Sequence, residues 1–570
     1  MQDIEDLVTD LSQYTFTSKK DYDKAMLKVR RKYKLQPKKS EINAVYKNLV
    51  KKGVINYNPE LEQLSIAKSV RSESGVLVIA LFTSAYPGPE GERFDCKYDC
   101  HYCPSQPGQP RSYLDTEPGV MRAIECGYDC ITQFDSRLDQ LVRCGHIPDK
   151  LEILVLGGTW SSYPQEYRDQ FILDIYYAAN TYGRKGERRD RMTLNEEKYS
   201  NQKGDKCRII GITLETRPDC VSPSEIVKFR EYGCTRVQLG VQHTDDEILR
   251  KINRRCYLRH TKRAIRMLKE CGFKIDIHLM PDLPGSSIKK DREMFEMVLN
   301  DEDLQVDQWK VYPTSVTPYT KIKEWYENGG YKPYAESDFE GFFELLIWMK
   351  SQVHYRIRLM RVIRDIPERS IIGGNKISHL RDVLKIEMKK RGLICKCIRC
   401  REVKDPLAIN DIDNAVLYID EYRASNGTEY YLSFENKERS VLYGQLRLRF
   451  NDNIDKNIFP ELKGSALIRE LHVYGRVIKV GEKSSKVQHT GFGKKMLKEA
   501  EKIVKRHGVN KIAVISGEGV KDYYVKFGYK DEGYYMTKIL FKSWIEEYFF
   551  SFCVFMMIVE TFYELILNMI

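Results

Sequence analysis

Short apolar runs alternate with longer helical segments through the middle of the chain. The runs 76–82, 151–156, 209–214, 237–241, 275–280 and 309–312 have the length and composition of buried strands. Between them, apolar residues recur with helical spacing over 164–177, 223–231, 259–271 and 288–299. Six repeats of strand and helix predict parallel strands with right-handed crossovers. We therefore expect a partial (β/α)6 barrel of TIM type over residues 75–394, more helical after 341.

Four further regions flank this pattern. Residues 413–540 form a second α/β region, with apolar runs at 430–434, 441–450, 466–473, 511–515 and 534–540 and a helix at 493–506. Residues 1–74 read as a small helical, basic region, and a cysteine-rich stretch, 395–412, links the two α/β regions. The apolar tail, 541–570, has 548–559 as its longest uncharged run, whereas a membrane span needs about 20 apolar residues. We expect a docked amphipathic helix there and no integral membrane insertion.

Length and composition narrow the class of protein. A chain of 570 residues is too long for one core, and at about 100–200 residues per domain it should hold two to four domains. Hydrophobic residues make up 42% and charged residues 31%, which excludes a disordered chain. The N-terminus carries acidic residues without an apolar core, so we expect a cytoplasmic protein. Its close-spaced cysteines then indicate metal ligands before disulfides.

Positive charge is concentrated near the N-terminus. The chain has 93 lysines and arginines against 81 acidic residues, a net charge of +12. The basic residues of the N-terminal cluster are Lys19, Lys20, Lys24, Lys28, Arg30, Arg31, Lys32, Lys34, Lys38, Lys39, Lys47, Lys51 and Lys52. Two readings are open: a solvated helix face, or a surface that neutralises the phosphates of a nucleic acid.

Cys96, Cys100 and Cys103 form a C-x3-C-x2-C motif just after the first predicted strand. Three thiolates can bind three irons of a [4Fe-4S] cluster and leave the fourth iron open for another ligand. A structural zinc site or unrelated buried cysteines are the alternatives, although His101 within the motif is poorly placed as a fourth zinc ligand. The spacing resembles that of the radical S-adenosylmethionine (SAM) family. There, the open iron binds SAM and reduction yields a 5′-deoxyadenosyl radical.

Glycines or polar residues stand where the second to sixth predicted strands end, which is where barrels place their active sites. They are Gly157 and Gly158 after the second strand, Glu215 and Arg217 after the third, Gln242 after the fourth, His278 and Asp282 at the fifth, and Lys310 and Tyr312 at the sixth. Each alone could be an ordinary solvated residue. We interpret Gly157, Gly158, Glu215, Arg217 and Gln242 as SAM-binding candidates. Lys310 and Tyr312 are catalytic candidates.

A second cysteine group is Cys395, Cys397 and Cys400. With His379 upstream it could complete a tetrahedral zinc site with three cysteine ligands and one histidine ligand. The alternative is three reduced cysteines in a loop.

The second α/β region contains a Q-x-x-G-x-G loop, Gln488, His489, Thr490, Gly491, Phe492 and Gly493, directly before a predicted helix. Successive backbone N–H groups and a helix N-terminus can hold a diphosphate. The loop and its flanking strands resemble the coenzyme A site of the GNAT acetyltransferases. Tyr524, in the closing element of that pattern, is a third catalytic candidate, and ordinary polar packing is its alternative.

Together these stretches resemble the family of Elongator catalytic subunits, over about residues 65–540. The strings that carry the resemblance include MRAIECGYD, GITLETRPD, LGVQHTDDEIL, HLMPDLPG, RELHVYG and QHTGFG. The resemblance implies that acetyl-CoA is bound by Lys150, by Glu470, Leu471, His472 and Val473, by Gln488–Gly493 and by Tyr524.

The resemblance also implies the reaction and the partners. The adenosyl radical removes hydrogen from the acetyl methyl of acetyl-CoA, the carbon radical adds to C5 of the wobble uridine of tRNA, and thioester hydrolysis leaves a 5-carboxymethyl group. Expected partners are the anticodon stem-loop of tRNA, an electron donor for the cluster and accessory subunits of the Elongator type. Because the acetyl group must reach the radical, we expect the coenzyme loop to face Cys96–Cys103 across a shared cleft. Two other functions remain as alternatives: a protein (lysine or histone) acetyltransferase, and a non-catalytic scaffold subunit.

Overall fold

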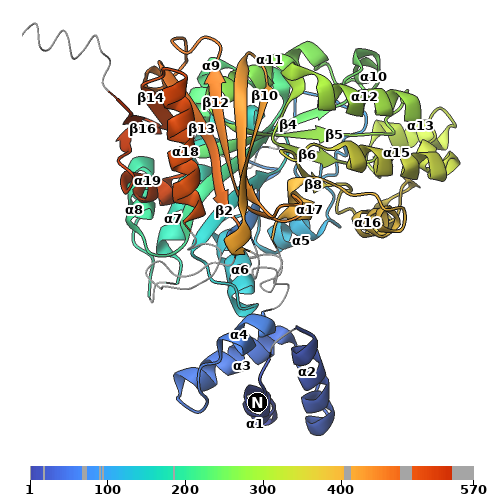
Figure 1. Ribbon diagram of the computed structural model, residues 1–570. Coiled ribbons are helices and arrows are strands. Elements are labelled where there is room, and N and C mark those ends of the chain that lie inside the picture. The colour runs from blue at the N-terminus through green and yellow to red at the C-terminus, as the bar shows by residue number, and fades with distance from the viewer. Residues whose placement is uncertain are drawn as a thin grey trace, which may run out of the picture.

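The computed structural model describes residues 2–16, 19–66, 74–88, 92, 96–183, 186–403, 412–475 and 491–541. Its N-terminal part is a group of four helices: α1 (Gln2–Ser12), α2 (Lys19–Tyr33), α3 (Lys39–Lys51) and α4 (Pro59–Ser65). They enclose a hydrophobic core of their own and project from the main body of the molecule, in blue in Figure 1. Helix α3 contacts α6 (Cys130–Arg143) of the body.

The main body is built on an open sheet of seven parallel strands. Its strands are β1 (Leu77–Phe82), β2 (Lys150–Leu156), β3 (Arg208–Thr216), β4 (Cys234–Gln242), β5 (Lys274–Leu279), β6 (Gln308–Val311) and β8 (Arg358–Arg361), hydrogen-bonded in that order. Because β1 and β8 are the two edges of the sheet, the structure is a half-barrel. The six predicted strands are confirmed. The seventh, β8, was missed because its sequence RLMR has a single fully buried apolar residue, Leu359.

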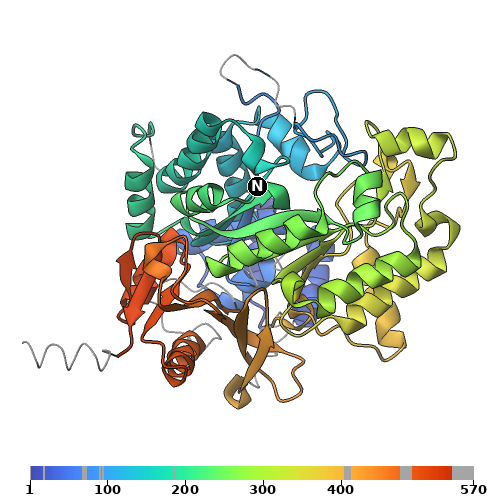
Figure 2. The same cartoon turned by 90° about the horizontal axis from the view of Figure 1, so that it is seen from above.

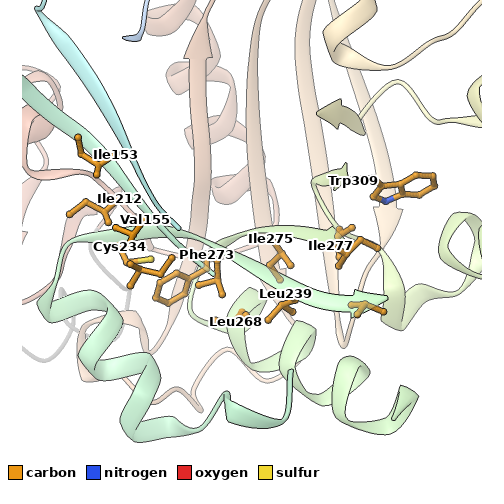
Figure 3. Packing of buried hydrophobic residues seen from close by; sticks show 14 of the residues in the cluster. Ile153, Val155, Ile212, Cys234, Leu239, Leu268, Phe273, Ile275, Ile277 and Trp309 are labelled. Carbon is orange, nitrogen blue, oxygen red and sulfur yellow. The ribbon is translucent and has the colours of Figure 1, made fainter. Parts of the chain in front are cut away.

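Helices cover the convex face of the half-barrel (Figure 2). The principal ones are α6, α7 (Gln165–Thr181), α9 (Pro223–Glu231), α11 (Leu258–Glu270), α12 (Ile288–Asn300) and α15 (Phe339–Gln352). Alternate strand residues, such as Ile153, Ile212, Leu239 and Ile277, point into this apolar layer, where Leu268 of α11 also packs (Figure 3). Because side chains alternate between the faces of a strand, the residues between them lie on the concave face.

The C-terminal part is a second seven-stranded sheet, in the order β10-β11-β12-β13-β14-β16-β15. Its strands are β10 (Val416–Arg423), β11 (Gly427–Glu435), β12 (Leu442–Asn451), β13 (Ser465–Val473), β14 (Lys511–Val514), β15 (Lys530–Glu532) and β16 (Tyr535–Ile539). All neighbours are antiparallel except β13 and β14, between which the chain forms α18 (Phe492–Arg506). The sequence analysis missed β10 and β15. Neither strand contains a fully buried residue, so neither shows the alternation that marks a half-buried strand.

The C-terminal sheet caps the amino ends of the half-barrel strands. Arg469 of β13 donates to the backbone oxygen of Phe273, directly before β5, at 2.7 Å. Arg447 of β12 donates to the oxygen of Arg356, before β8, at 2.6 Å. Gly517 packs so tightly on Ile210 of β3 that a Cβ there would lie 2.1 Å from the backbone oxygen of Ile210. The two α/β regions are therefore joined at the end of the barrel opposite to its active-site end.

Two predicted features fall outside the described residues: Gln488, His489 and Thr490 of the coenzyme loop, and the tail after Phe541. Within the described part of the chain, no helix has both the length and the apolar character needed to cross a membrane.

Candidate active site

The loop that carries Cys96, Cys100 and Cys103 follows β1 at the carboxyl ends of the half-barrel strands. Cys100 is buried, and Cys96 and Cys103 are half-buried. Burial and the neighbouring thiols of Cys100 and Cys96 raise the pKa of the Cys103 thiol, and Arg111 opposes the effect. The three thiols are thus close enough to interact electrostatically and lie beside a cation.

Two further arginines bind the central thiol of this loop. Arg254 and Arg217 each donate to Cys100 Sγ, at 3.5 and 3.6 Å. Arg217 also pairs with Asp219 at 3.0 Å, donates to the backbone oxygen of Arg254 at 2.8 Å and stacks on Tyr98 at 3.5 Å. Hydrogen bonds and positive charge near sulfur stabilise thiolates, and they tune the potential of iron–sulfur clusters. Arg217 therefore holds the cysteine loop, and its guanidinium is already fully engaged.

One group of three thiols is close enough to bind a single metal ion. In the described part of the chain, the only group of metal-binding side chains whose ligand atoms all lie within 4.8 Å of one another is Cys395, Cys397 and Cys400. A single zinc ion, with Zn–S bonds of about 2.3 Å, needs such close thiols. The Sγ atoms of Cys96, Cys100 and Cys103 do not all lie within 4.8 Å of one another.

Gly157 and Gly158, after β2, pack against residues that precede and follow the cysteines of this loop. Gly157 has φ of 138°, and a Cβ there would lie 1.8 Å from Thr83 Oγ1. A Cβ on Gly158, with φ of 104°, would lie 3.4 Å from the backbone oxygen of Arg111. Both positions therefore need glycine, and at Gly157 the reason is Thr83 and not open space for a ligand.

The predicted polar residues of β3, β5 and β6 come together on the concave face. Lys310 Nζ donates to Gln238 Oε1 at 2.5 Å, and His278 Nε2 lies 3.3 Å from the same oxygen. The other nitrogen of His278 is 3.5 Å from Glu215, and its ring makes an edge contact with Tyr312 at 5.5 Å. Sequence reasoning identified all of these residues except Gln238.

Burial shifts the protonation of this group. It lowers the pKa of Lys310 to about 8, although Glu215 and Asp276 act in the opposite direction. Burial and the nearby cations, Lys310 first, lower the pKa of His278 well below its usual value, so the imidazole is neutral. Burial raises the pKa of Glu215. A lysine with a pKa of about 8 can move a proton near neutral pH, which supports Lys310 as a catalytic candidate.

Gln242 and Asp282 form hydrogen bonds with backbone groups near the carboxyl ends of the half-barrel strands. Gln242 has φ of 73°, and its oxygen accepts from Met280 N at 2.7 Å. Asp282 accepts from the backbone N–H groups of Tyr334 at 2.7 Å and Ala335 at 3.0 Å. Burial raises the pKa of Asp282 to about 8. Asp282 therefore anchors the segment around Tyr334.

The second cysteine group lies between the two α/β regions. Hydrogen bonds from Cys395 and Cys400 hold the pKa of the Cys397 thiol well below its usual value. His379 is exposed at the N-cap of α16 (Leu380–Lys390) and is not part of this close group. The structure thus brings together three of the four predicted ligands.

The coenzyme candidates of β13 lie against the base of the half-barrel. Glu470 pairs with Arg447 at 3.0 Å and with Lys274 of β5 at 3.4 Å. His472 Nε2 is 2.8 Å from the backbone oxygen of Ser74, which precedes β1. Leu471 and Val473, between and after them, pack against the core of the C-terminal sheet.

A gap in strand pairing opens beside these residues. Strand β13 pairs with β14 only over Ser465–Ile468, and it continues without that partner to Val473. Gly491, with φ of 75°, is the N-cap of α18, and a Cβ on Gly493 would lie 2.6 Å from Tyr523 Oη. Tyr524 is 7% exposed, and burial together with the charges of Tyr523 and Glu470 raises its pKa.

Lys150 is the first residue of β2 and therefore lies at the base of the half-barrel. Burial lowers its pKa, and Asp149 opposes the effect. Glu152, two residues along on the same face, is subject to the charges of Lys274, His472 and Glu470. Lys150 thus lies on the side of the half-barrel that meets β13. Because Gln488, His489 and Thr490 of the coenzyme loop lie outside the described residues, the cleft expected between that loop and the cysteine loop stays a prediction.

Arg111 and Arg254 are the contacts of the cysteine loop that sequence reasoning missed. Arg254 stands 154 positions from Cys100 in the chain, so no local spacing could have indicated the contact.

Comparisons with known proteins agree with this arrangement. Residues 94–298 match the radical SAM superfamily, and residues 306–390 match the Radical_SAM C-terminal domain. The chain is 37% identical to a tRNA uridine(34) acetyltransferase of Methanocaldococcus jannaschii, over 83% of this chain and 86% of that protein. It is 36% identical to Elongator complex protein 3 of Homo sapiens, over 91% and 93%. A solved structure of archaeal Methanocaldococcus infernus Elp3 with an N-terminus deletion superposes with a TM-score of 0.68 and 35% identity, over 82% of this chain and 99% of that one.

Proposed function

Since the chain belongs to the family of Elongator complex protein 3 and the tRNA uridine(34) acetyltransferases, we propose that it is a radical SAM enzyme that modifies the wobble uridine of tRNA. One observation carries the proposal. Three cysteines with the C-x3-C-x2-C spacing lie at the carboxyl end of a parallel half-barrel, and arginines bind the central thiol. This is where barrels perform chemistry.

Cys96, Cys100 and Cys103 would hold a [4Fe-4S] cluster, and the residues at the strand ends around Glu215 and Gln242 would hold SAM. The cluster and SAM supply a 5′-deoxyadenosyl radical when bound. The chain's own contribution is to hold Cys100 with Arg217 and Arg254, and to place buried ionisable groups, such as Lys310 and His278, on the concave face, where burial lowers their pKa values. Lys310, with a pKa of about 8, is the group best placed to move a proton there.

The C-terminal sheet would bind acetyl-CoA in the manner of a GNAT domain. Three features support this part of the proposal: β13 diverges from β14, α18 begins at a glycine N-cap with positive φ, and Glu470 and His472 border the gap. Backbone N–H groups at a helix N-terminus favour a diphosphate. Lys150, at the base of the half-barrel, would add a cation to the same coenzyme.

The N-terminal helices would bind tRNA. On α2, the side chains of Lys24, Lys28 and Arg31 are exposed and fall on one face because residues three and four apart are neighbours on a helix. Such a face can neutralise successive phosphates. The names of the relatives also imply accessory subunits, and a one-electron donor is required to reduce the cluster. Cys395, Cys397 and Cys400 would hold a structural zinc ion.

Anaerobic reconstitution tests the proposal against the two alternatives. We expect a modified uridine only when iron and sulfide, a reductant, SAM, acetyl-CoA and tRNA are all present. A protein acetyltransferase would act without SAM and reductant, and a scaffold subunit would form no product under any condition. A lysine-acetylated peptide formed at equal rate without the cluster would refute the assignment.

A further inference from the structure

Arg254 is a cation buried beside the cysteine loop. It lies between α10 (Asp246–Lys251) and α11 and is 5% exposed. It donates to Cys100 Sγ at 3.5 Å and to the backbone oxygen of Gly240, near the end of β4, and its Nε is buried without a hydrogen-bond partner. A Cβ on Gly240 would lie 2.8 Å from the guanidinium, so a glycine there leaves room for Arg254. The structure thus places a buried positive charge next to the central thiol.

Arg254 differs from the other two arginines at this loop because it lacks a carboxylate partner. Arg111 pairs with Asp99 at 2.9 Å. Arg217 binds Asp219 through two hydrogen bonds of 3.0 Å, so its charge is balanced within the protein. Within the part of the chain that the structure describes, Arg254 forms no ion pair with a carboxylate. Because an unpaired buried charge is strongly destabilising, Arg254 needs an anion at the loop itself.

The anion available at this place is the group of thiolates, together with the cluster that they would bind. Three thiolates make a [4Fe-4S] cluster anionic, and reduction by one electron adds a further negative charge. A neighbouring cation therefore stabilises the reduced state more than the oxidised state, and it raises the reduction potential. The contact of Arg254 with Cys100 and its orphaned Nε fit an anion of this kind.

We propose that Arg254 is the charge partner of the cluster and sets its reduction potential through Cys100, whereas Asp219 cancels most of the contribution of Arg217. The inference rests on the proposed function, because it requires a cluster on the three cysteines. The step concerned is the transfer of one electron from a low-potential donor to the cluster, in which no bond forms or breaks. Because it acts through Cys100, Arg254 is a positioning residue and not a catalytic one.

Three variants separate the effect of charge from that of structure. Arg254→Gln removes the unbalanced cation and keeps an amide donor. Asp219→Asn keeps the shape of the side chain and leaves the charge of Arg217 unbalanced, so it should shift the potential in the opposite direction. Arg255→Gln is the matched control. It removes the same charge one position along the chain, at a side chain that is exposed and screened by solvent.

The experiment uses the full chain, reconstituted anaerobically with iron and sulfide. SAM, acetyl-CoA and tRNA are left out, so the readout is independent of activity. Iron and sulfide per chain give the cluster content. Stepwise reduction with titanium(III) citrate, followed by electron paramagnetic resonance of the reduced cluster, gives the potential.

The expected shifts have opposite signs. At a fixed solution potential, the ratio of reduced to oxidised cluster should fall about ten-fold in Arg254→Gln, because charges close to a buried anion are weakly screened. It should rise about ten-fold in Asp219→Asn and stay within about two-fold in Arg255→Gln. For one electron, a ten-fold change in this ratio corresponds to about 59 mV.

Arg254→Gln with a full cluster at the potential of the unaltered chain would overturn the inference. An equal shift in Arg255→Gln would overturn it as well, because the potential would then follow net charge and not the buried cation. If Arg254→Gln binds no cluster, Asp219→Asn decides: a higher potential supports the inference, and an unchanged or lower one refutes it. If the unaltered chain itself binds no iron and sulfide, the proposed function fails, and the inference fails with it.

Discussion

Removing the charge of Asp307 should loosen the junction between the half-barrel and the C-terminal sheet. Asp307 is fully buried and accepts from Arg469 at 2.6 and 3.0 Å and from Ile275 N at 2.8 Å. Arg447 lies 3.4 Å away. Asp307→Asn keeps the shape of the side chain but leaves two buried arginines with one anion fewer. Breaking a buried pair in this way costs about 3–5 kcal/mol, and the remaining partner Glu429, 2.8 Å from Arg469, favours the lower end.

Urea unfolding measures the loss. Trp309, two residues along and fully buried, is a local fluorescent reporter. The midpoint should fall by roughly 1 M or more, given slopes of about 1–3 kcal/mol/M. Asp303→Asn is the matched control, because its pair with Lys262 is 3.4 Å long and its side chain is 44% exposed, so we expect less than about 1 kcal/mol. Equal midpoints for the two variants would refute the reasoning.

The Asp307 carboxylate also determines in which direction pH changes the stability of the junction. The Arg469 and Arg447 guanidinium groups overcome the effect of burial and hold the pKa of Asp307 far below its ordinary value of 3.8. A depressed pKa contributes stability that is fully present above the unfolded value and is lost as the pH falls below it. The contribution of Asp307 to the junction should therefore be insensitive to pH near neutrality and be lost in acid. In Asp307→Asn the acid-dependent part of this loss should be smaller.

Three further predictions concern the sites. Cys100→Ser should lower iron and sulfide in the reconstituted chain to background, since one iron loses its ligand, whereas Cys126→Ser should keep them; cluster content equal in both would contradict the assignment. Replacing Lys24, Lys28 and Arg31 by alanine should weaken tRNA binding and flatten its log–log salt dependence by roughly 0.7–0.9 per lost phosphate contact, and an unchanged slope would mean that this face is merely solvated. Lys150→Ala should weaken acetyl-CoA binding about ten-fold by calorimetry, because charged contacts contribute about 1.5–3 kcal/mol. If Lys206→Ala, at an exposed lysine, has the same effect, Lys150 has no specific role.

The fold could be predicted where strands are buried on at least one face. Strands β1–β6 and helix α9 were found because apolar runs and helical spacing are local signals. Strand β10 was missed because none of its residues is fully buried, and its pairing with β11 depends on the neighbouring strand and not on its own sequence. Two residues of the basic N-terminal cluster, Arg30 and Lys32, have partners within the protein. Arg30 donates to Pro37 O at 2.9 Å and Lys32 pairs with Asp10 at 2.7 Å.

Some features of the candidate site could likewise be predicted from the sequence, and others could not. The cysteine spacing and the polar strand ends could be predicted, since both are local. What could not be predicted is how the second α/β region docks, because that depends on contacts such as Arg469 with Asp307, 162 positions apart. Docking at the amino ends brings Glu470 to Lys274 of β5 and His472 to the backbone before β1.

The buried charges of the junction limit how the half-barrel and the C-terminal sheet can move relative to each other. Lys269, Glu429, Arg449 and Arg469 are all fully buried where the C-terminal sheet meets the half-barrel, and Lys269 contacts Glu429 at 2.7 Å. Opening this junction would separate several buried charges from their partners, each at a cost of about 3–5 kcal/mol. A hinge motion that brings the two sites together by closing one domain onto the other would need to break these contacts in every cycle.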